Sequence, residues 1–233
     1  MSAPSYWLLM PAAGSGVRMH GDAARVPKQY LTLAGRLVIE HALAPFLADP
    51  RCTGLVVALR AGDERFARLA LARDPRVRTV TGGAERADSV RAGLAAVAAA
   101  AAGGDPWVLV HDAARPCLAS ADLEALLAAL PESPDGALLG LKIADTVKRA
   151  DAADRVLETV PRAGLWRAAT PQAFRLKRLT EALARAPDAT DEASAVEVLG
   201  DRPRLVAGSP MNLKLTTASD IAAAERWLDG GAR

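Results

Sequence analysis

The feature that most constrains the fold is a repeated alternation of short apolar runs with longer, alanine-rich stretches. Each apolar run has the length of a strand, and each alanine-rich stretch has the length and composition of a helix. This alternation predicts an α/β fold in which helices cover both faces of a mostly parallel sheet. The expected strands are 6–11, 54–60, 77–80, 107–111 and 136–143, and the expected helices are 37–49, 63–73, 85–102 and 120–130.

The alternation is interrupted between about residues 144 and 169. Two strand-like segments, 146–149 and 155–160, flank the polar residues 150–154, which is the pattern of a hairpin. Two strands cannot bury an apolar face by themselves, so we expect an arm that projects from the fold and packs on a second copy of the chain. We interpret residues 1–233 as a single domain that carries this dimerisation arm. Beyond the arm, the expected helices are 175–186, 191–199 and 219–228, and the expected strands are 204–207 and 212–216.

Composition excludes several classes of protein. The chain has 233 residues, of which 51% are hydrophobic and 24% charged, as expected for a folded globular protein and not for a disordered one. A net charge of +2 and an aromatic content of 4% disfavour a protein that binds nucleic acid. No apolar run is long enough to cross a membrane, and the run at 6–10 lacks the basic residue of a secretory signal. The two cysteines, Cys52 and Cys117, exclude a disulfide framework and favour a cytoplasmic location.

A glycine-rich segment, 11–19, follows the first expected strand and reads PAAGSGVRM. Glycine lets backbone N–H groups approach a phosphate, and α/β sheets bind phosphates where such strands end. The segment matches neither standard phosphate motif, because Met19 replaces a glycine of the dinucleotide fingerprint and Asp22 replaces the lysine of the P-loop. Arg18 and Lys28 supply two cations that can straddle a triphosphate. A tight turn with two solvated surface charges explains the segment equally well when it is taken alone.

A second candidate lies at the end of the expected strand 107–111. Asp112 follows this strand and should therefore lie at the same edge of the sheet as the glycine-rich segment. Mg²⁺ binds through one or two carboxylates and completes its shell with phosphate and water, so Asp112 can hold it beside a triphosphate. Taken alone, however, the motif favours a simpler interpretation in which Asp112 caps a turn and pairs with Arg115.

Several hydroxyl and cationic side chains further along the chain indicate no function individually, because such residues are more often surface residues than ligands. Together they offer the donors that a phosphorylated polyol needs. They are Thr146, Arg162, Thr170, Thr190 and Lys214. Other chemistry is not indicated, since the histidines show no metal-ligand spacing and no Gly-x-Ser-x-Gly motif occurs.

Five motifs occur in a fixed order along the chain. They are PAAGSGVRM at 11–19, PKQY at 27–30, GGAERADSV at 82–90, HDAARP at 111–116 and TDEAS at 190–194. Together they closely resemble the 2-C-methyl-D-erythritol 4-phosphate cytidylyltransferases of the non-mevalonate isoprenoid pathway, and the likeness extends from about residue 7 to residue 227. The first motif indicates only a nucleotidyltransferase, whereas the third and fourth together are much more specific.

The resemblance implies a Rossmann-like fold of the nucleotidyltransferase type, a homodimer, and transfer of CMP from CTP to methylerythritol phosphate with release of pyrophosphate. It implies that Arg18, Lys28 and Lys214 hold the triphosphate and stabilise the transition state. The residues that it places around the nucleotide are Pro11, Ala12, Ala13, Gly14, Ser15, Gly16, Gly82, Gly83, Ala84 and Ser89. Those that it places around methylerythritol phosphate are Asp112, Ala113, Arg115, Thr146, Arg162, Thr170 and Thr190.

Two of these assignments involve a partner subunit or a metal ion. The resemblance implies that Thr146 and Arg162 reach the acceptor from the arm of the partner subunit. It also implies that Asp112 binds Mg²⁺, with other divalent cations as alternatives.

Two other functions remain open on the sequence. A nucleotidyltransferase acting on a sugar phosphate or on ribitol phosphate would share the glycine-rich segment and the lysine, but not both 111–116 and 190–194. A nucleotide-binding regulatory module that has lost catalysis would not need to keep the cations and the aspartate. Few residues follow Trp227, so we expect no second enzyme fused behind it.

Overall fold

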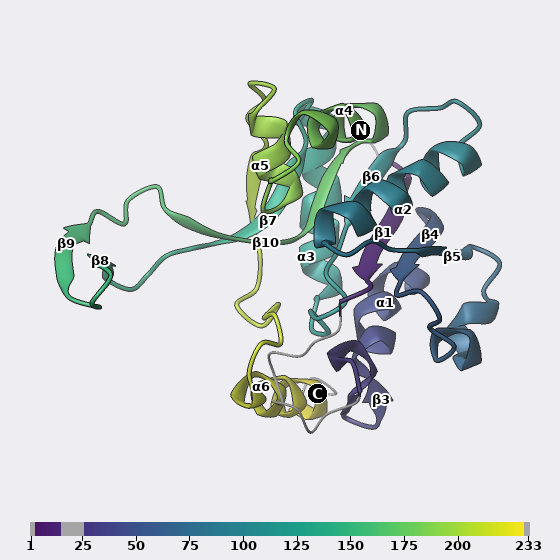
Figure 1. Ribbon diagram of the computed structural model, residues 1–233, viewed down its shortest axis with the longest axis horizontal. Coiled ribbons are helices and arrows are strands. Elements are labelled where there is room, and N and C mark those ends of the chain that lie inside the picture. Colours follow the sequence, from purple (N-terminus) through teal and green to yellow (C-terminus); the bar gives the residue numbers. More distant parts are fainter. Residues whose placement is uncertain (1–2, 15–25, 231–233) are drawn as a thin grey trace.

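The computed structural model describes residues 3–14 and 26–230, which form one seven-stranded sheet covered by helices (Figure 1). In spatial order, the strands are β11 (Arg204–Ala207), β7 (Ala137–Lys142), β10 (Trp166–Arg175), β6 (Trp107–Val110), β1 (Tyr6–Ala12), β4 (Cys52–Leu59) and β5 (Val77–Thr81). Neighbouring strands are parallel except at β10, which runs antiparallel to both β6 and β7. The predicted α/β fold with a mostly parallel sheet is therefore confirmed.

The central strands are apolar along their length because both faces of the sheet are covered. All four residues of β6 are buried, and in β4 only Thr53 is exposed. One face packs against α1 (Val38–Ala48) and α3 (Ser120–Ala129). The other face packs against α2 (Arg86–Ala100), α4 (Leu176–Arg185) and α5 (Glu192–Glu197).

The first strand and α2 approach each other closely in the middle of the helix. Gly93 faces β1, and a Cβ at this position would overlap the side chain of Leu9. A larger residue there would force the buried Leu9 side chain to shift. The N-terminus of α2 is consequently held beside the carboxyl end of β1.

A third, smaller cluster forms at one end of the molecule. There α6 (Ala218–Gly230) packs near a short hairpin formed by β2 (Thr32–Leu33) and β3 (Arg36–Leu37) (Figure 1). Buried Leu215 belongs to this cluster and anchors the segment that precedes α6. No helix among the residues described is long and apolar enough to span a membrane.

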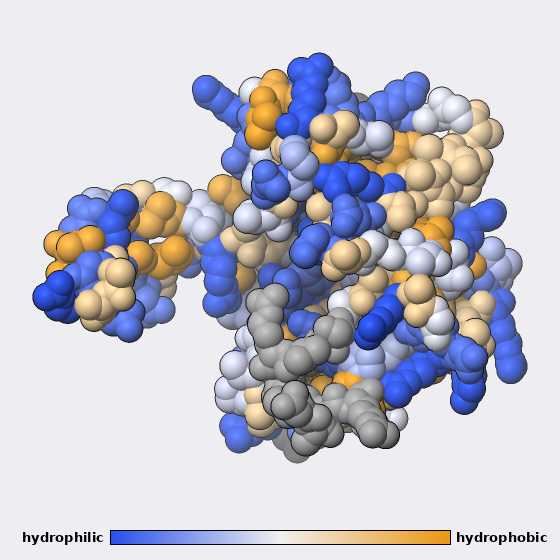
Figure 2. Space-filling view, in the orientation of Figure 1, coloured by the Kyte–Doolittle hydropathy of each residue, from blue (hydrophilic) through white to orange (hydrophobic). Residues whose placement is uncertain are grey.

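The segment between β7 and β10 leaves the body as an extended arm (Figure 1). Its tip is an antiparallel hairpin of β8 (Val147–Ala150) and β9 (Val156–Val160), as the sequence predicts. Apolar side chains appear on the arm in Figure 2, and among them Val156 and Leu157 are 62% and 63% exposed. Contact of the arm with a second copy of the chain stays a prediction.

Two predicted elements are wrong, and one strand was not predicted. Residues 63–73 form two short 3₁₀ helices, Phe66–Arg68 and Ala70–Arg73, because Leu69 between them is extended. Residues 212–216 form no strand, since they are held by single contacts to loops instead of a strand ladder. The strand β10 was not predicted, because residues 144–169 were assigned to the arm and 170–174 to no element; its pairing with β7 is irregular between Ala168 and Gln172, around Pro171.

Candidate active site

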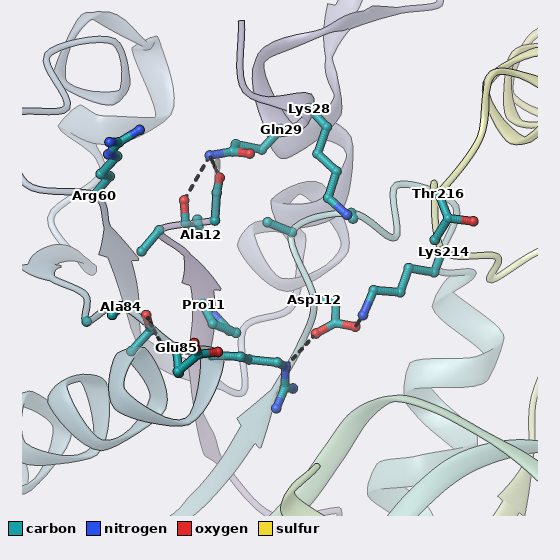
Figure 3. A pocket seen from close by; sticks show the side chains of 17 residues that line it. Pro11, Ala12, Lys28, Gln29, Arg60, Ala84, Glu85, Asp112, Lys214 and Thr216 are labelled. Carbon is teal, nitrogen blue, oxygen red and sulfur yellow. Dashed lines mark hydrogen bonds and ion pairs between the residues drawn. The ribbon is translucent and has the colours of Figure 1, made fainter. Parts of the chain in front are cut away.

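A cavity of about 680 Å³ lies where the parallel strands β1, β4 and β6 end, beside the N-terminus of α2 (Figure 3). Ligands bind in α/β folds at this edge of the sheet, and the volume suits a small molecule. Its lining combines the backbone of small residues on one side with charged side chains on the other. The cavity is therefore the candidate active site.

Small residues from two segments form one wall. The predicted nucleotide-binding residues that line the cavity are Pro11, Ala12, Ala13, Gly14, Gly83, Ala84 and Ser89. Gly82 lies directly behind this wall, where a Cβ would lie 2.7 Å from both Ala13 Cβ and Ser89 Oγ. Glycine at this position thus brings the two segments together. Ser15, Gly16 and Arg18 lie outside the described residues.

A buried glutamine connects Lys28 to the same wall. The 3₁₀ helix Lys28–Tyr30 begins at Lys28, and the next residue, Gln29, donates from Nε2 to the carbonyl of Ala12 at 2.8 Å (Figure 3). Lys28 lines the cavity and its Nζ donates to the carbonyl of Leu215 at 3.4 Å. No role was predicted for Gln29, although its place beside Lys28 in the motif PKQY was the available signal.

The carboxylate of Asp112 faces several cations, so its contacts go beyond the turn and the pairing with Arg115. The turn does form, through donation from the Arg115 backbone N to the Asp112 carbonyl at 3.0 Å. The side chain, however, binds Arg86 through Oδ1 at 3.1 Å and Lys214 through Oδ2 at 2.9 Å (Figure 3). Arg115 Nε lies 3.7 Å from Oδ2. Burial raises the pKa of Asp112, but the charges of Arg86 and Lys214 outweigh burial and hold that pKa well below its usual range.

Arg86 also binds a second carboxylate, which the sequence analysis gave no role. Its two terminal nitrogens donate to the two oxygens of Glu192 at 2.7 and 3.0 Å. Glu192 is the first residue of α5 and lies on its buried face with Ala195 and Val196. A carboxylate on an otherwise apolar helix face was the signal for a buried cation nearby. We call Asp112, Arg86, Lys214, Arg115 and Glu192 the Asp112 cluster.

Lys214 reaches the cluster although its segment is not a strand. The backbone N of Leu215 donates to the carbonyl of Ala114 at 2.8 Å, which ties this segment to the loop that follows β6. Lys28, Asp112 and Lys214 are thus brought from three separate parts of the chain to one cavity. Ala113 lines the cavity as well.

Thr170 and His111 lie behind Asp112 and do not line the cavity. The Thr170 hydroxyl accepts from the Asp112 backbone N at 3.0 Å and lies 3.1 Å from His111 Nδ1. Burial lowers the pKa of His111 to about 4, so the ring is neutral near pH 7. With Nε2 placed 3.2 Å from the Arg115 carbonyl, the neutral ring donates there and accepts from Thr170. These contacts fix the backbone at Asp112.

The remaining predicted acceptor residues lie apart from the cavity lining. Arg115 is largely buried beside Asp112 and donates to the carbonyl of Asn212 at 2.8 Å. Thr190 is exposed just before α5. Thr146 directly precedes β8 and Arg162 follows β9 by two residues, so both lie on the arm beside its tip hairpin, and the expectation that they bind the acceptor in a partner's site stays a prediction.

The structure permits a test of whether Asp112 fits a magnesium ion. Among the residues described, no group of three or more His, Cys, Asp or Glu side chains could hold a metal. Asp112 is ionised and lines a cavity large enough for a triphosphate. One such carboxylate fits a Mg²⁺ that is shared with substrate phosphates, and does not fit a site made of protein ligands alone.

Comparison with known proteins gives a consistent result. The family model IspD, described as 2-C-methyl-D-erythritol 4-phosphate cytidylyltransferase, matches residues 6–230. A protein of that name from Ectopseudomonas mendocina (strain ymp) is 53% identical over 227 residues, 96% of this chain and 94% of its own length. One from Pseudomonas fluorescens (strain SBW25) is 50% identical over 229 residues, 97% and 94% of the two chains.

Solved structures agree with the sequence comparison. A crystal structure of 4-diphosphocytidyl-2C-methyl-D-erythritol synthase superposes with a TM-score of 0.84 at 37% identity, covering 97% of this chain and 100% of that one. The 2-C-methyl-D-erythritol 4-phosphate cytidylyltransferase of Thermus thermophilus gives a TM-score of 0.77 at 30% identity, covering 97% and 99%.

Proposed function

Because the chain belongs to the 2-C-methyl-D-erythritol 4-phosphate cytidylyltransferase family, we propose that it transfers CMP from CTP to the phosphate of methylerythritol phosphate and releases pyrophosphate. Membership makes the chain a nucleotidyltransferase of isoprenoid biosynthesis. The observation that carries the proposed chemistry is the meeting of Lys28, Asp112 and Lys214 in one cavity at the sheet edge.

The proposed nucleophile needs no general base. A phosphate monoester has a second pKa near 6 and is already a dianion at neutral pH. The described residues that line the cavity include no histidine, and His111 behind it is engaged by Thr170 and the Arg115 carbonyl. What the reaction requires is positive charge, because one anion attacks another.

Lys28 and Lys214 supply that charge in this proposal. An in-line attack on the α-phosphorus places new negative charge on the equatorial oxygens and on the departing pyrophosphate. Cations held in place before the reaction stabilise such charge without reorganising. Arg18 is proposed as a third cation, from the part of the chain outside the described residues.

Asp112 would hold Mg²⁺ together with oxygens of the triphosphate. Bound there, the ion would neutralise phosphate charge and polarise the phosphorus under attack. The support for this assignment is that Asp112 stays ionised in spite of its burial. Its Oδ2 contacts Lys214, which is 40% exposed and can turn towards a phosphate instead.

The wall of small residues is proposed to select cytosine. Gly83 and Ala84 face the cavity with little side chain, so main-chain N–H and C=O groups are close to any base that enters. A site that closes around the smaller ring would admit a pyrimidine more readily than a purine, and backbone donors and acceptors can distinguish the edges of bases.

We further propose a cytoplasmic homodimer. A two-stranded hairpin has no core of its own, and Val156 and Leu157 at the tip of the arm are exposed in a single chain. A second copy would cover that surface and receive Thr146 and Arg162 near its own cavity. The free cysteines Cys52 and Cys117 suit a reducing compartment.

A substrate panel tests the function directly. Release of pyrophosphate would be measured with CTP, UTP, ATP and GTP, each combined with methylerythritol phosphate, ribitol phosphate or a sugar 1-phosphate in the presence of Mg²⁺. We expect turnover with CTP and methylerythritol phosphate. Preference for another acceptor would contradict the assigned substrate, and CTP binding without any turnover would favour a regulatory module.

A further inference from the structure

Arg86 joins two buried carboxylates at the floor of the cavity, and it comes from a different element than either of them. It is the first residue of α2, whereas Asp112 follows β6 and Glu192 begins α5. We propose that Arg86, held in place by Glu192, is a positioning residue that fixes the direction of the Asp112 carboxylate in the nucleotidyl transfer. The inference rests on the proposed function.

The contacts divide the guanidinium between its two partners. Both terminal nitrogens are used by Glu192, and Nε donates to Asp112 Oδ1 at 3.1 Å. A guanidinium is planar, so a two-point contact on one side sets the direction in which Nε points. Lysine could not reproduce this arrangement, because an ammonium group has no fixed plane.

The direction of Asp112 follows from that of Arg86. With Oδ1 held by Arg86, the other oxygen, Oδ2, is presented to Lys214 at 2.9 Å. Rotation of the carboxylate would break the contact with Arg86. Asp112 therefore keeps Oδ2 directed towards Lys214 and the cavity.

The burial of Glu192 indicates that its role is to orient Arg86 and not to stabilise the fold. Its side chain is 1% exposed, and a buried ion pair is on average no more stabilising than apolar packing of the same volume. What an ion pair provides and apolar packing does not is a fixed orientation for the charged partner. In this fold the partner is the residue that touches Asp112.

Direct contact of Arg86 with a triphosphate is the competing explanation, since Arg86 also lines the cavity. The two explanations differ in what they require of Glu192. If Arg86 binds ligand directly, its loss raises KM for CTP, and Glu192 matters little. If Arg86 positions Asp112, loss of either Arg86 or Glu192 lowers kcat in the same way.

The test compares Arg86→Lys and Glu192→Gln with the matched control Arg91→Lys. Arg91 lies on the same helix but binds Asp88 and the carbonyls of Leu183 and Pro187, and it does not line the cavity. We expect kcat to fall about 10- to 100-fold in both test variants, the range usual for residues that orient a functional ligand. KM for CTP should change little, and the control should keep the kcat of the unmodified enzyme.

The double variant separates a shared role from two independent ones. If Glu192 acts through Arg86, Arg86→Lys combined with Glu192→Gln should be no slower than the slower single variant. Multiplicative losses would overturn the inference. So would an unchanged kcat with a lowered unfolding midpoint, which marks a purely structural role, or a raised KM for CTP in the Arg86 variant alone.

Circular dichroism and a crystal structure with CTP distinguish a loss of positioning from a loss of folding. Far-ultraviolet circular dichroism establishes that each variant is folded before its kinetics are compared. If the variants do not fold, a crystal structure of the unmodified enzyme with CTP decides: Arg86 bound to both carboxylates supports the inference, and a broken Arg86–Asp112 contact overturns it. Failure of the proposed function itself is separate, because it would appear as absence of pyrophosphate release by the unmodified enzyme.

Discussion

Replacing Lys214 with methionine should separate catalysis from stability. Lys214→Met keeps the length and the apolar stem of the side chain and removes only the ammonium group. In the folded protein that group contacts Asp112 Oδ2 at 2.9 Å, and Lys214 is 40% exposed. The same carboxylate remains paired with Arg86 at 3.1 Å and has Arg115 at 3.7 Å. The variant therefore leaves no buried charge without a partner.

The two expected magnitudes differ clearly. An ion pair with a partly exposed member contributes about 0.2–1 kcal/mol, so the free energy of unfolding should fall by no more than this. Removing one preorganised donor from a site of developing charge costs about 100- to 1000-fold in kcat, roughly 3–4 kcal/mol. Activity should be lost while the fold is kept.

The assay measures pyrophosphate release at saturating CTP and acceptor, together with urea unfolding. Lys177→Met is the matched control, because Lys177 is exposed on α4 and does not line the cavity. The control should retain both activity and stability. Normal turnover of Lys214→Met would remove Lys214 from the mechanism, and a stability loss as large as the activity loss would show that the lysine mainly holds the loop together.

Three other predictions concern His111, Gln29 and the arm. The free energy of unfolding should decrease as the pH falls from about 6.5 to about 4. In this range the unfolded chain binds a proton at His111, whereas the folded chain does not, because burial lowers the pKa of His111 to about 4. Urea titrations at several pH values measure this, and His111→Gln should flatten this part of the profile. Gln29→Leu leaves a buried carbonyl without its donor, so it should cost about 1–3 kcal/mol in urea unfolding and raise KM for CTP; unchanged values would show that the glutamine does not hold the wall. Val156→Lys combined with Leu157→Lys should convert a dimer to a monomer in light scattering, and a dimer of unchanged mass would place the interface elsewhere.

The fold and the position of the cavity could be predicted because they follow from patterns of apolar residues that are local in the sequence. Apolar runs the length of strands predicted the parallel sheet, and parallel strands end at one edge. Asp112 and the segment beginning at Pro11 therefore had to lie near each other, as they do. Lys214 was placed there only by resemblance: the strand predicted at 212–216 does not form, and the segment is tied to the sheet edge by the hydrogen bond between Leu215 N and the Ala114 carbonyl.

What could not be predicted depends on pairs of residues far apart in the chain. Arg86 and Glu192 are 106 positions apart, and neither motif shows that the two side chains meet. The role of Gln29 depends on a hydrogen bond to a carbonyl, which leaves no trace in the pattern of side chains. The strand β10 was missed because its first residues were assigned to the arm, and its Pro171 is accommodated by a local irregularity in the pairing with β7. Tertiary packing decides each of these cases.

The Asp112 cluster also explains how a site can hold several cations before its anionic ligand arrives. Unpaired cations brought together at a half-buried floor would repel one another and destabilise the fold. Glu192 and Asp112 offset that repulsion, and they do so unequally, because Glu192 is fully buried with Arg86 whereas the Lys214 end of the cluster is open to the cavity. Lys214 can exchange the Asp112 oxygen for a phosphate oxygen while Asp112 keeps Arg86, so the exchange leaves no buried charge alone. Because Arg86 is firmly paired and Lys214 only loosely, the cluster is stable without ligand, and Lys214 remains able to bind a phosphate.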